Sequence, residues 1–156
     1  MEQLRETDDA GRTCRPYPDP EGGAPLRCCL RRSEAGERIA LVSYAPLRRW
    51  AAGTGARPGA YDEQGPVFIH ADACDGPRGT GYPFSGPGAL RTLRRYDAEG
   101  RIVGGRLLEI PEAAGRAVEA FDRALAEAFA DPAVALVHVR AVEYGCFHFE
   151  VRRVRR

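Results

Sequence analysis

The stretch VHVRAVEYGCFHFE, residues 137–150, decides the fold of the C-terminal part of this chain. Two short runs rich in apolar, strand-forming residues flank Glu143-Tyr144-Gly145, which is typical of a turn. The pattern predicts a β-hairpin with strands over residues 133–140 and 145–154. The same stretch holds two of the chain's three histidines and one of its five cysteines. A hairpin that concentrates reactive side chains in this way is a candidate functional site.

The pairing register of this hairpin decides which reactive side chains meet, because alternate residues of a strand share a face. In one register Arg140 pairs with Gly145, and His138 faces Phe147. In a register shifted by one residue, Arg140 pairs with Cys146, and two imidazoles share a face with a thiol and a guanidinium. We favour the first register, because it buries aromatic rings rather than a cluster of polar groups.

Residues 111–130, just before the hairpin, predict the only long helix. Val118, Phe121, Leu125 and Phe129 recur at spacings of three and four, which places them on one apolar face. A proline suits the first turn of this helix, and an Asp-Pro pair follows its end.

Further upstream the sequence alternates between strand-like runs and loops. Residues 90–110 predict a second hairpin that turns at Asp-Ala-Glu-Gly, and residues 38–44 and 65–71 predict two more strands. Residues 53–88 contain nine of the 18 glycines, and a long loop of this kind is often functional.

These elements predict an α+β protein. We expect a mainly antiparallel sheet, with barrel-like closure left open, and one long amphipathic helix before a C-terminal hairpin. Residues 25–156 would form a single domain. Residues 1–24 are rich in charged residues, proline and glycine, and they predict a mobile N-terminal segment.

Composition narrows the classes of partner. The 156 residues carry a net charge of +1, so no global field steers the chain to nucleic acid, and no apolar run reaches the roughly 20 residues that span a bilayer. Five cysteines, an odd number, favour a reducing cytoplasmic setting. All positively charged side chains are arginine, which together with abundant alanine, glycine and proline indicates a GC-rich bacterial genome such as that of an actinobacterium.

Three stretches together resemble a known family. They are residues 61–74 (YDEQGPVFIHADAC), residues 93–102 (LRRYDAEGRI) and the hairpin quoted above. They are similar to a bacterial family called domain of unknown function 1203, over about residues 25–153. The resemblance implies a small bacterial protein and brings no assigned reaction. The family's cysteine pair flanks Arg-His before a leucine where this chain has LRCCL at residues 26–30, and its asparagine after His-x-Arg is replaced by Ala141.

The candidate chemistry ranked first is acid/base catalysis on a small molecule without a cofactor or a metal. A histidine can act as general base near neutral pH, and an arginine can hold a carboxylate, enolate or phosphate oxygen. This reading predicts an isomerase, cyclase or hydrolase, in specialised metabolism, that binds neither nucleic acid nor membrane, with a homodimer left open. The candidate catalytic residues are His70, His138, Arg140 and Cys146, and the candidate substrate-binding residues are Tyr61, Glu63, Cys74, Arg95 and Tyr96.

Two alternatives stay open. One is a small-molecule binding or accessory protein without catalysis. The other is a metal-binding protein, because nitrogen and sulfur ligands suit a tetrahedral metal ion. The adjacent pair Cys28-Cys29 gives little support to a metal site, since paired ligand cysteines usually lie two to four residues apart. The proposed metal ligands are His70, Cys74, His138 and either Cys146 or His148.

Overall fold

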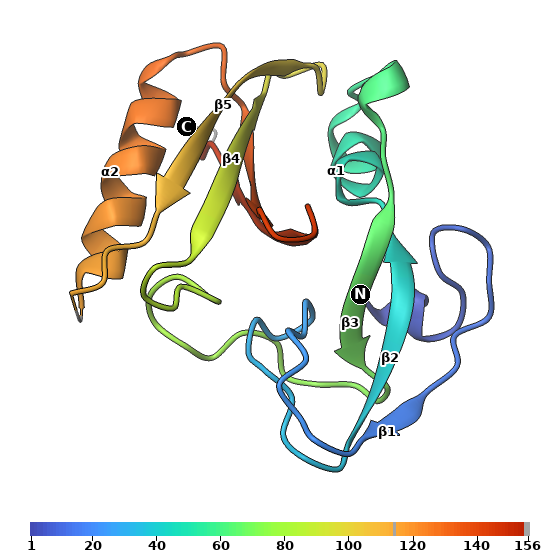
Figure 1. The fold of residues 1–156 in the computed structure, drawn as a ribbon. Helices are drawn as coiled ribbons and strands as arrows, with labels where there is room; N and C mark the ends of the chain where they lie inside the picture. The colour runs from blue at the N-terminus through green and yellow to red at the C-terminus, as the bar shows by residue number, and fades with distance from the viewer. Residues whose placement is uncertain (114, 155–156) are drawn as a thin grey trace. The chain divides into compact units, whose positions relative to one another are not determined.

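The computed structural model describes residues 1–113 and 115–154. It contains two helices and two antiparallel sheets, which confirms the predicted α+β class, and neither sheet closes into a barrel (Figure 1). The chain divides into two compact units. The first comprises Met1–Pro46 and Gln64–Phe84, and the second comprises Leu47–Glu63 and Ser85–Arg156. The predicted division into a mobile segment and a single domain stays a prediction.

The first unit is built on a three-stranded antiparallel sheet in the order β1-β2-β3. Its strands are β1 (Tyr17–Asp19), β2 (Glu37–Tyr44) and β3 (Gly65–His70), preceded by the short 3-10 helix η1 (Glu2–Arg5). The strands predicted over residues 38–44 and 65–71 are thereby confirmed. The core of this unit consists of Leu4, Leu26, Cys28, Cys29, Ile39, Ala40, Val42, Val67 and Ile69.

The second unit is built on a four-stranded antiparallel sheet in the order β5-β4-β6-β7. Its strands are β4 (Leu90–Tyr96), β5 (Ile102–Glu109), β6 (Leu136–Ala141) and β7 (Phe147–Arg152). The helix α1 (Pro46–Thr54) and the 3-10 helix η2 (Gly59–Tyr61) lie between β2 and β3 in sequence. No helix was predicted here. Pro46 does follow a strand, but it also begins a helix, as proline at a first helical position can.

The long helix α2 spans Arg116–Ala130 and is shorter at its start than predicted. Its buried side chains are Ala120, Phe121, Ala124, Leu125 and Ala128. Val118 is 44% exposed, so its predicted place on the buried face is wrong. The stripe of alanines allows close packing and turns the helix so that Val118 falls just outside the buried arc. Among the described residues, no helix combines the length and apolarity needed to cross a membrane.

The register of the C-terminal hairpin differs from both predicted registers. His138 pairs with Glu150, Val139 with Phe149, and Arg140 with Phe147, so His148 is the extra residue of a β-bulge. A bulge places two residues of one strand opposite one residue of the other and interrupts the regular alternation. Phe147 therefore shares a face with His138, whereas Phe149 packs against α2 on the other face, where it contacts the ring of Phe121.

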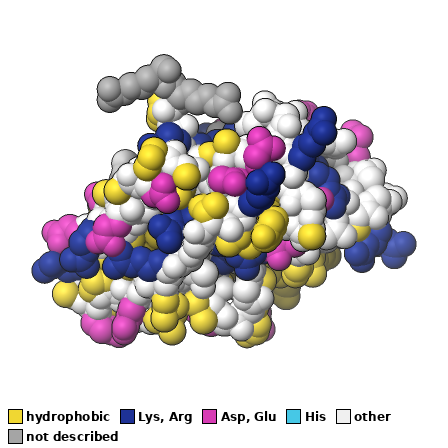
Figure 2. Space-filling view, turned by 90° about the horizontal axis from the view of Figure 1, so that it is seen from above, with side chains coloured by type: hydrophobic (Ala, Val, Ile, Leu, Met, Phe, Trp, Pro, Cys, Tyr) yellow, Lys and Arg dark blue, Asp and Glu magenta, His cyan; other side chains and the backbone are white. Residues whose placement is uncertain are grey.

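Arginine and acidic side chains are interspersed over the face of the molecule seen in Figure 2. This distribution agrees with the net charge of +1.

Candidate metal centre

Three segments of the first unit bring three cysteines and one histidine together. Cys28 and Cys29 lie in a turn whose neighbour Leu26 forms a parallel bridge with Phe68 of β3. The N–H of Arg27 donates to the carbonyl of Phe68 at 2.8 Å, which holds this turn beside the strand. His70 is the last residue of β3, and Cys74 follows in the loop after it. The four ligand atoms lie within 4.8 Å of one another.

The separations within this cluster suit a tetrahedral metal ion. The Sγ atoms of Cys28 and Cys29 lie 3.3 Å and 3.7 Å from Nδ1 of His70. Ordinary zinc–sulfur and zinc–nitrogen bonds in a tetrahedron place sulfur and nitrogen about 3.5 Å apart, and two sulfurs about 3.8 Å apart. The observed sulfur–nitrogen distances match these edges. The largest separation allowed within the cluster, 4.8 Å, exceeds these ideal ligand–ligand distances by only about 1 Å.

The local backbone explains how adjacent cysteines face one point. In a strand their side chains would lie on opposite faces. Here the N–H of Leu30 donates to the carbonyl of Leu26 at 2.9 Å, so the chain folds into a turn. Leu30 has a positive φ of 59°, which is uncommon for a branched residue and is typical of functional or strained positions. The adjacent spacing of the two cysteines, which gave little support to a metal site in the sequence, therefore does not prevent both sulfurs from joining the cluster.

The far side of the His70 ring contacts a charged pair. Nε2 lies 2.9 Å from Oε1 of Glu37 and 3.0 Å from Nη2 of Arg31. Arg31 binds both carboxylate oxygens of Glu37, and this ion pair lowers the pKa of Glu37 to about 2. With its proton on Nε2, the ring donates to Glu37 and directs the lone pair of Nδ1 at the sulfurs. With its proton on Nδ1, the ring accepts from Arg31 and donates to Cys28.

The thiols differ in how readily they ionise. Burial raises the pKa of Cys28 to about 12. For Cys74, burial also acts to raise the pKa, but the N–H of Gly76 and the side chains of His70 and Cys28 outweigh it, and the pKa falls to about 7. Nη2 of Arg5 lies 3.8 Å from the Cys74 sulfur, and the N–H of His70 donates to the Cys28 sulfur at 3.2 Å. Both of these donors stabilise thiolates.

A pocket of about 620 Å³ opens beside the cluster, and Cys29, His70 and Cys74 form part of its wall. Its charged lining residues form three ion pairs, Arg31 with Glu37, Arg38 with Asp72, and Arg78 with Asp75. Because the charges balance, this pocket does not select an anion by net charge alone.

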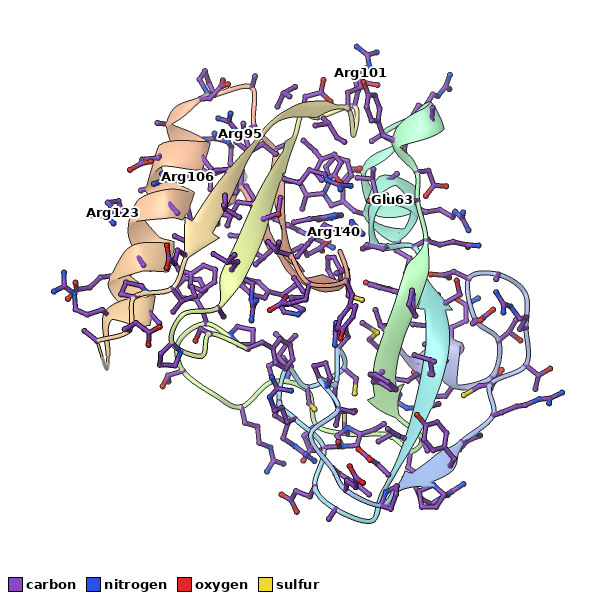
Figure 3. All side chains as sticks on the ribbon, viewed as in Figure 1. Glu63, Arg95, Arg101, Arg106, Arg123 and Arg140 are labelled. Atoms are coloured by element: carbon purple, nitrogen blue, oxygen red, sulfur yellow. The ribbon has the colours of Figure 1, made fainter. Side chains whose placement is uncertain are left out.

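The other sequence-predicted residues occur in the second unit and divide between the two faces of its sheet. Glu63, Tyr96, His138 and Arg140 lie on the face away from α2. Arg95 lines a separate pocket of about 280 Å³ on the α2 face, together with Arg106 (Figure 3). Tyr61 is exposed, and the sulfur of Cys146 lies 3.9 Å from the carbonyl of Tyr144. Their predicted catalytic and binding roles stay predictions.

The burial of His138 leads to a pH-dependent stability. Burial is the main cause of its lowered pKa, the charges of Arg140 and Arg94 add to the effect, and Glu150 opposes it. The unfolded chain therefore takes up this proton at a higher pH than the folded protein does. The resulting stability is complete above the ordinary pKa of 6.5 and is lost as the pH falls below it.

We therefore expect the free energy of unfolding to fall from about pH 7.5 to about pH 5.5. The variant His138→Leu should show a flatter dependence over the same range, because leucine cannot take up the proton. Denaturant titrations of both proteins at several pH values measure this difference. If the free energy of unfolding varied with pH in the same way in both proteins, His138 would not be the source of the pH dependence.

The class of protein is thus a small α+β protein with two open antiparallel sheets and a Cys₃His cluster in its first unit. The profile of the family described as "Protein of unknown function (DUF1203)" matches residues 23–153. The chain belongs to this family, as the resemblance predicted. No curated protein and no solved structure matches it.

Proposed function

We propose that this protein binds one zinc-class transition-metal ion in its first unit, through Cys28, Cys29, His70 and Cys74. The observation that carries the proposal is the convergence of four nitrogen and sulfur ligand atoms, from three segments, within 4.8 Å. Three thiolates and one imidazole form a soft, tetrahedral ligand set, which zinc prefers and which magnesium and calcium do not.

The surroundings of His70 support this proposal independently of the sulfurs. Histidines that bind metals commonly donate their second ring N–H to a carboxylate, which fixes the ring and makes the other nitrogen a better ligand. Glu37 occupies this position at 2.9 Å, and Arg31 holds its carboxylate in place. Of the two proton positions on the ring, metal binding selects the one with the proton on Nε2.

A set of four protein ligands is typical of a structural site rather than a catalytic zinc with an open position. We propose that the ion ties the turn at Cys28 and Cys29 to the end of β3 and to the loop at Cys74. These segments form a wall of the pocket beside the cluster. The proposal includes a cytoplasmic location, because the thiols bind a metal only while they stay reduced. All five cysteines are free in the structure.

Acid/base catalysis by His138, ranked first from sequence, stays a prediction with less geometric support. His138 is 1% exposed, and it lines neither the pocket of about 620 Å³ in the first unit nor the pocket of about 280 Å³ beside α2. A general base has to reach the proton that it removes, directly or through one water.

Elemental analysis of the protein, purified without an affinity tag or chelator, tests the proposal. We expect one zinc ion per chain. Addition of cobalt(II) to the metal-free protein should give sulfur-to-cobalt charge-transfer bands and the visible bands of a tetrahedral site. Cys74→Ser should weaken these bands, whereas Cys146→Ser, which alters a thiol of the second unit, should leave them unchanged. Glu37→Gln should weaken metal binding by roughly 10- to 100-fold, with the exposed Glu34→Gln as its control.

Two results would overturn the proposal. One is a purified protein without stoichiometric metal that also shows no charge-transfer band on addition of cobalt(II). The other is a cobalt spectrum that responds equally to Cys74→Ser and Cys146→Ser. In either case the four side chains would be reduced thiols and a histidine of the core.

A further inference from the structure

We infer that the second unit contains a binding site for a small-molecule carboxylate, formed by Arg94 and Arg140 and occupied in this structure by the side chain of Glu63. This site does not depend on the metal proposed above, because all of its residues belong to the other unit. Figure 3 shows Glu63 and Arg140 on the side of the sheet away from α2.

Two guanidinium groups converge on a single carboxylate oxygen. Oε1 of Glu63 accepts a hydrogen bond from Nη1 of Arg140 at 2.6 Å and another from Nη1 of Arg94. Nε of Arg140 donates to the carbonyl of Gly145 at 3.0 Å, which fixes the orientation of this guanidinium. Two positive charges thus meet one negative charge. Arginine binds carboxylates well because its planar donors match their geometry.

The sheet presents these groups on one face. Arg94 of β4 pairs with His138 of β6, and paired residues of an antiparallel ladder point the same way. Tyr96 lies two residues after Arg94, and Arg140 lies two residues after His138, so all four side chains share this face. The rings of Tyr96 and His138 are 4.8 Å apart. The site is therefore held by strands rather than by loops.

Buried polar atoms beside the two arginines still lack partners. Among the described residues, neither ring nitrogen of His138 has a hydrogen-bond partner, although this residue is 1% exposed, and the buried hydroxyl of Tyr96 faces the guanidinium of Arg94. Nε2 of His138 lies 3.5 Å from Oε2 of Glu150, beyond the usual range of a hydrogen bond. Unsatisfied buried groups are unfavourable, and they commonly mark a place where a ligand or water completes the bonding.

Glu63 can leave this site more easily than the arginines can. Its side chain is 45% exposed, whereas that of Arg140 is 10% exposed. It lies in the loop after η2, where its neighbour Asp62 is held at 2.8 Å by Nε of Arg48. The side chain can therefore rotate into solvent while the loop backbone stays anchored. A half-exposed ion pair contributes little to stability, so a carboxylate from solution can replace it at little cost.

Acetate is the smallest probe of this site. The binding of acetate to wild-type protein and to Glu63→Ala can be followed by NMR chemical shifts and by thermal unfolding, with chloride at the same ionic strength as reference. We expect both proteins to respond to acetate beyond the effect of chloride. The wild type should bind roughly tenfold more weakly, because Glu63 competes for the site and leaves only a fraction of molecules open. Substitution of Arg94 by glutamine in the Glu63→Ala background should abolish the response.

A matched control is Glu143→Ala, which removes another exposed carboxylate that pairs with an arginine of the second unit, Arg91. This variant should respond to acetate no more strongly than the wild type does. Two outcomes overturn the inference. If Glu63→Ala responds equally to acetate and chloride, the arginines form no carboxylate site. If Glu63→Ala binds acetate but the wild type shows no binding even at saturating concentration, Glu63 is a permanent partner and the group is an internal ion pair.

Discussion

Zinc at about one thousand times its dissociation constant is expected to raise the free energy of unfolding of the wild-type protein by about 4 kcal/mol over the metal-free protein. The reason is linkage: only the folded first unit holds all four ligands together, whereas the unfolded chain keeps only two separate pairs, Cys28 with Cys29 and His70 with Cys74. Denaturant unfolding in zinc buffers and in chelator, with the thiols kept reduced, measures this difference.

Two cysteine variants separate the metal effect from a general effect of losing a thiol. Cys29→Ser removes a proposed ligand and should lose most of the stabilisation by zinc. Cys146→Ser should keep all of it, because Cys146 lies in the second unit. Equal unfolding midpoints for the wild type with and without zinc would contradict the expectation.

Phe121→Ala is expected to lower the free energy of unfolding of the second unit by about 3–5 kcal/mol. Phe121 is fully buried on α2 and packs against Phe149 of β7, with ring centroids 6.0 Å apart. Its removal would leave a cavity between the helix and the sheet. Val118→Ala, on the same helix but 44% exposed, should change stability by no more than about 0.5 kcal/mol.

Both variants can be compared with the wild type by denaturant unfolding under one set of conditions. The sequence pattern alone places Val118 and Phe121 on the same apolar face. It therefore predicts that replacing either one by alanine lowers the free energy of unfolding. Similar losses for the two variants would support that pattern against the helix orientation described here.

Several elements could be predicted from the sequence because their signals are local. The hairpin of β4 and β5 turns at the predicted Asp-Ala-Glu-Gly, and Gly100 adopts the positive φ that this turn requires. The strands β2 and β3 also occur where apolar runs predict them. The helix α1 was not predicted, because its nine residues are few and follow directly on a strand. Short helices gain most of their stability from tertiary contacts, here of Leu47 and Trp50 with Tyr96.

The candidate metal centre was only half predictable. His70 and Cys74 lie four residues apart, and this spacing suggested a metal site. Cys28 and Cys29 lie 42 and 41 residues before His70, and no local pattern shows that they return to it. The turn that directs both sulfurs to one point depends on the left-handed backbone of Leu30, a conformation that leucine rarely adopts. The sequence around the two cysteines, LRCCL at residues 26–30, contains no turn-forming residue that could have indicated it.

The pairing register of the C-terminal hairpin could not be predicted for a different reason. A bulge adds one residue to one strand without a distinct sequence signature, and neither regular register places both Phe147 and Glu150 on the face of His138, as the structure does. The arginine pair on Glu63 was missed as a unit, because only Glu63 and Arg140 had been singled out and Arg94 had not. Their meeting depends on the neighbouring position of β4 and β6 in the sheet.

The sequence separation of the ligands also sets an order of events during folding. A contact between Cys29 and His70 closes a loop of 41 residues, and closing such a loop costs on the order of 4 kcal/mol of chain entropy. Before this loop closes, a newly made chain can hold an ion only through one of two separate local pairs, Cys28 with Cys29 or His70 with Cys74. Pairing of β2 with β3 and the bridge of Leu26 to Phe68 have to close the loop before the two pairs can meet. Metal capture should then follow the rate of strand pairing, so that zinc uptake by the refolding protein reports when this sheet forms.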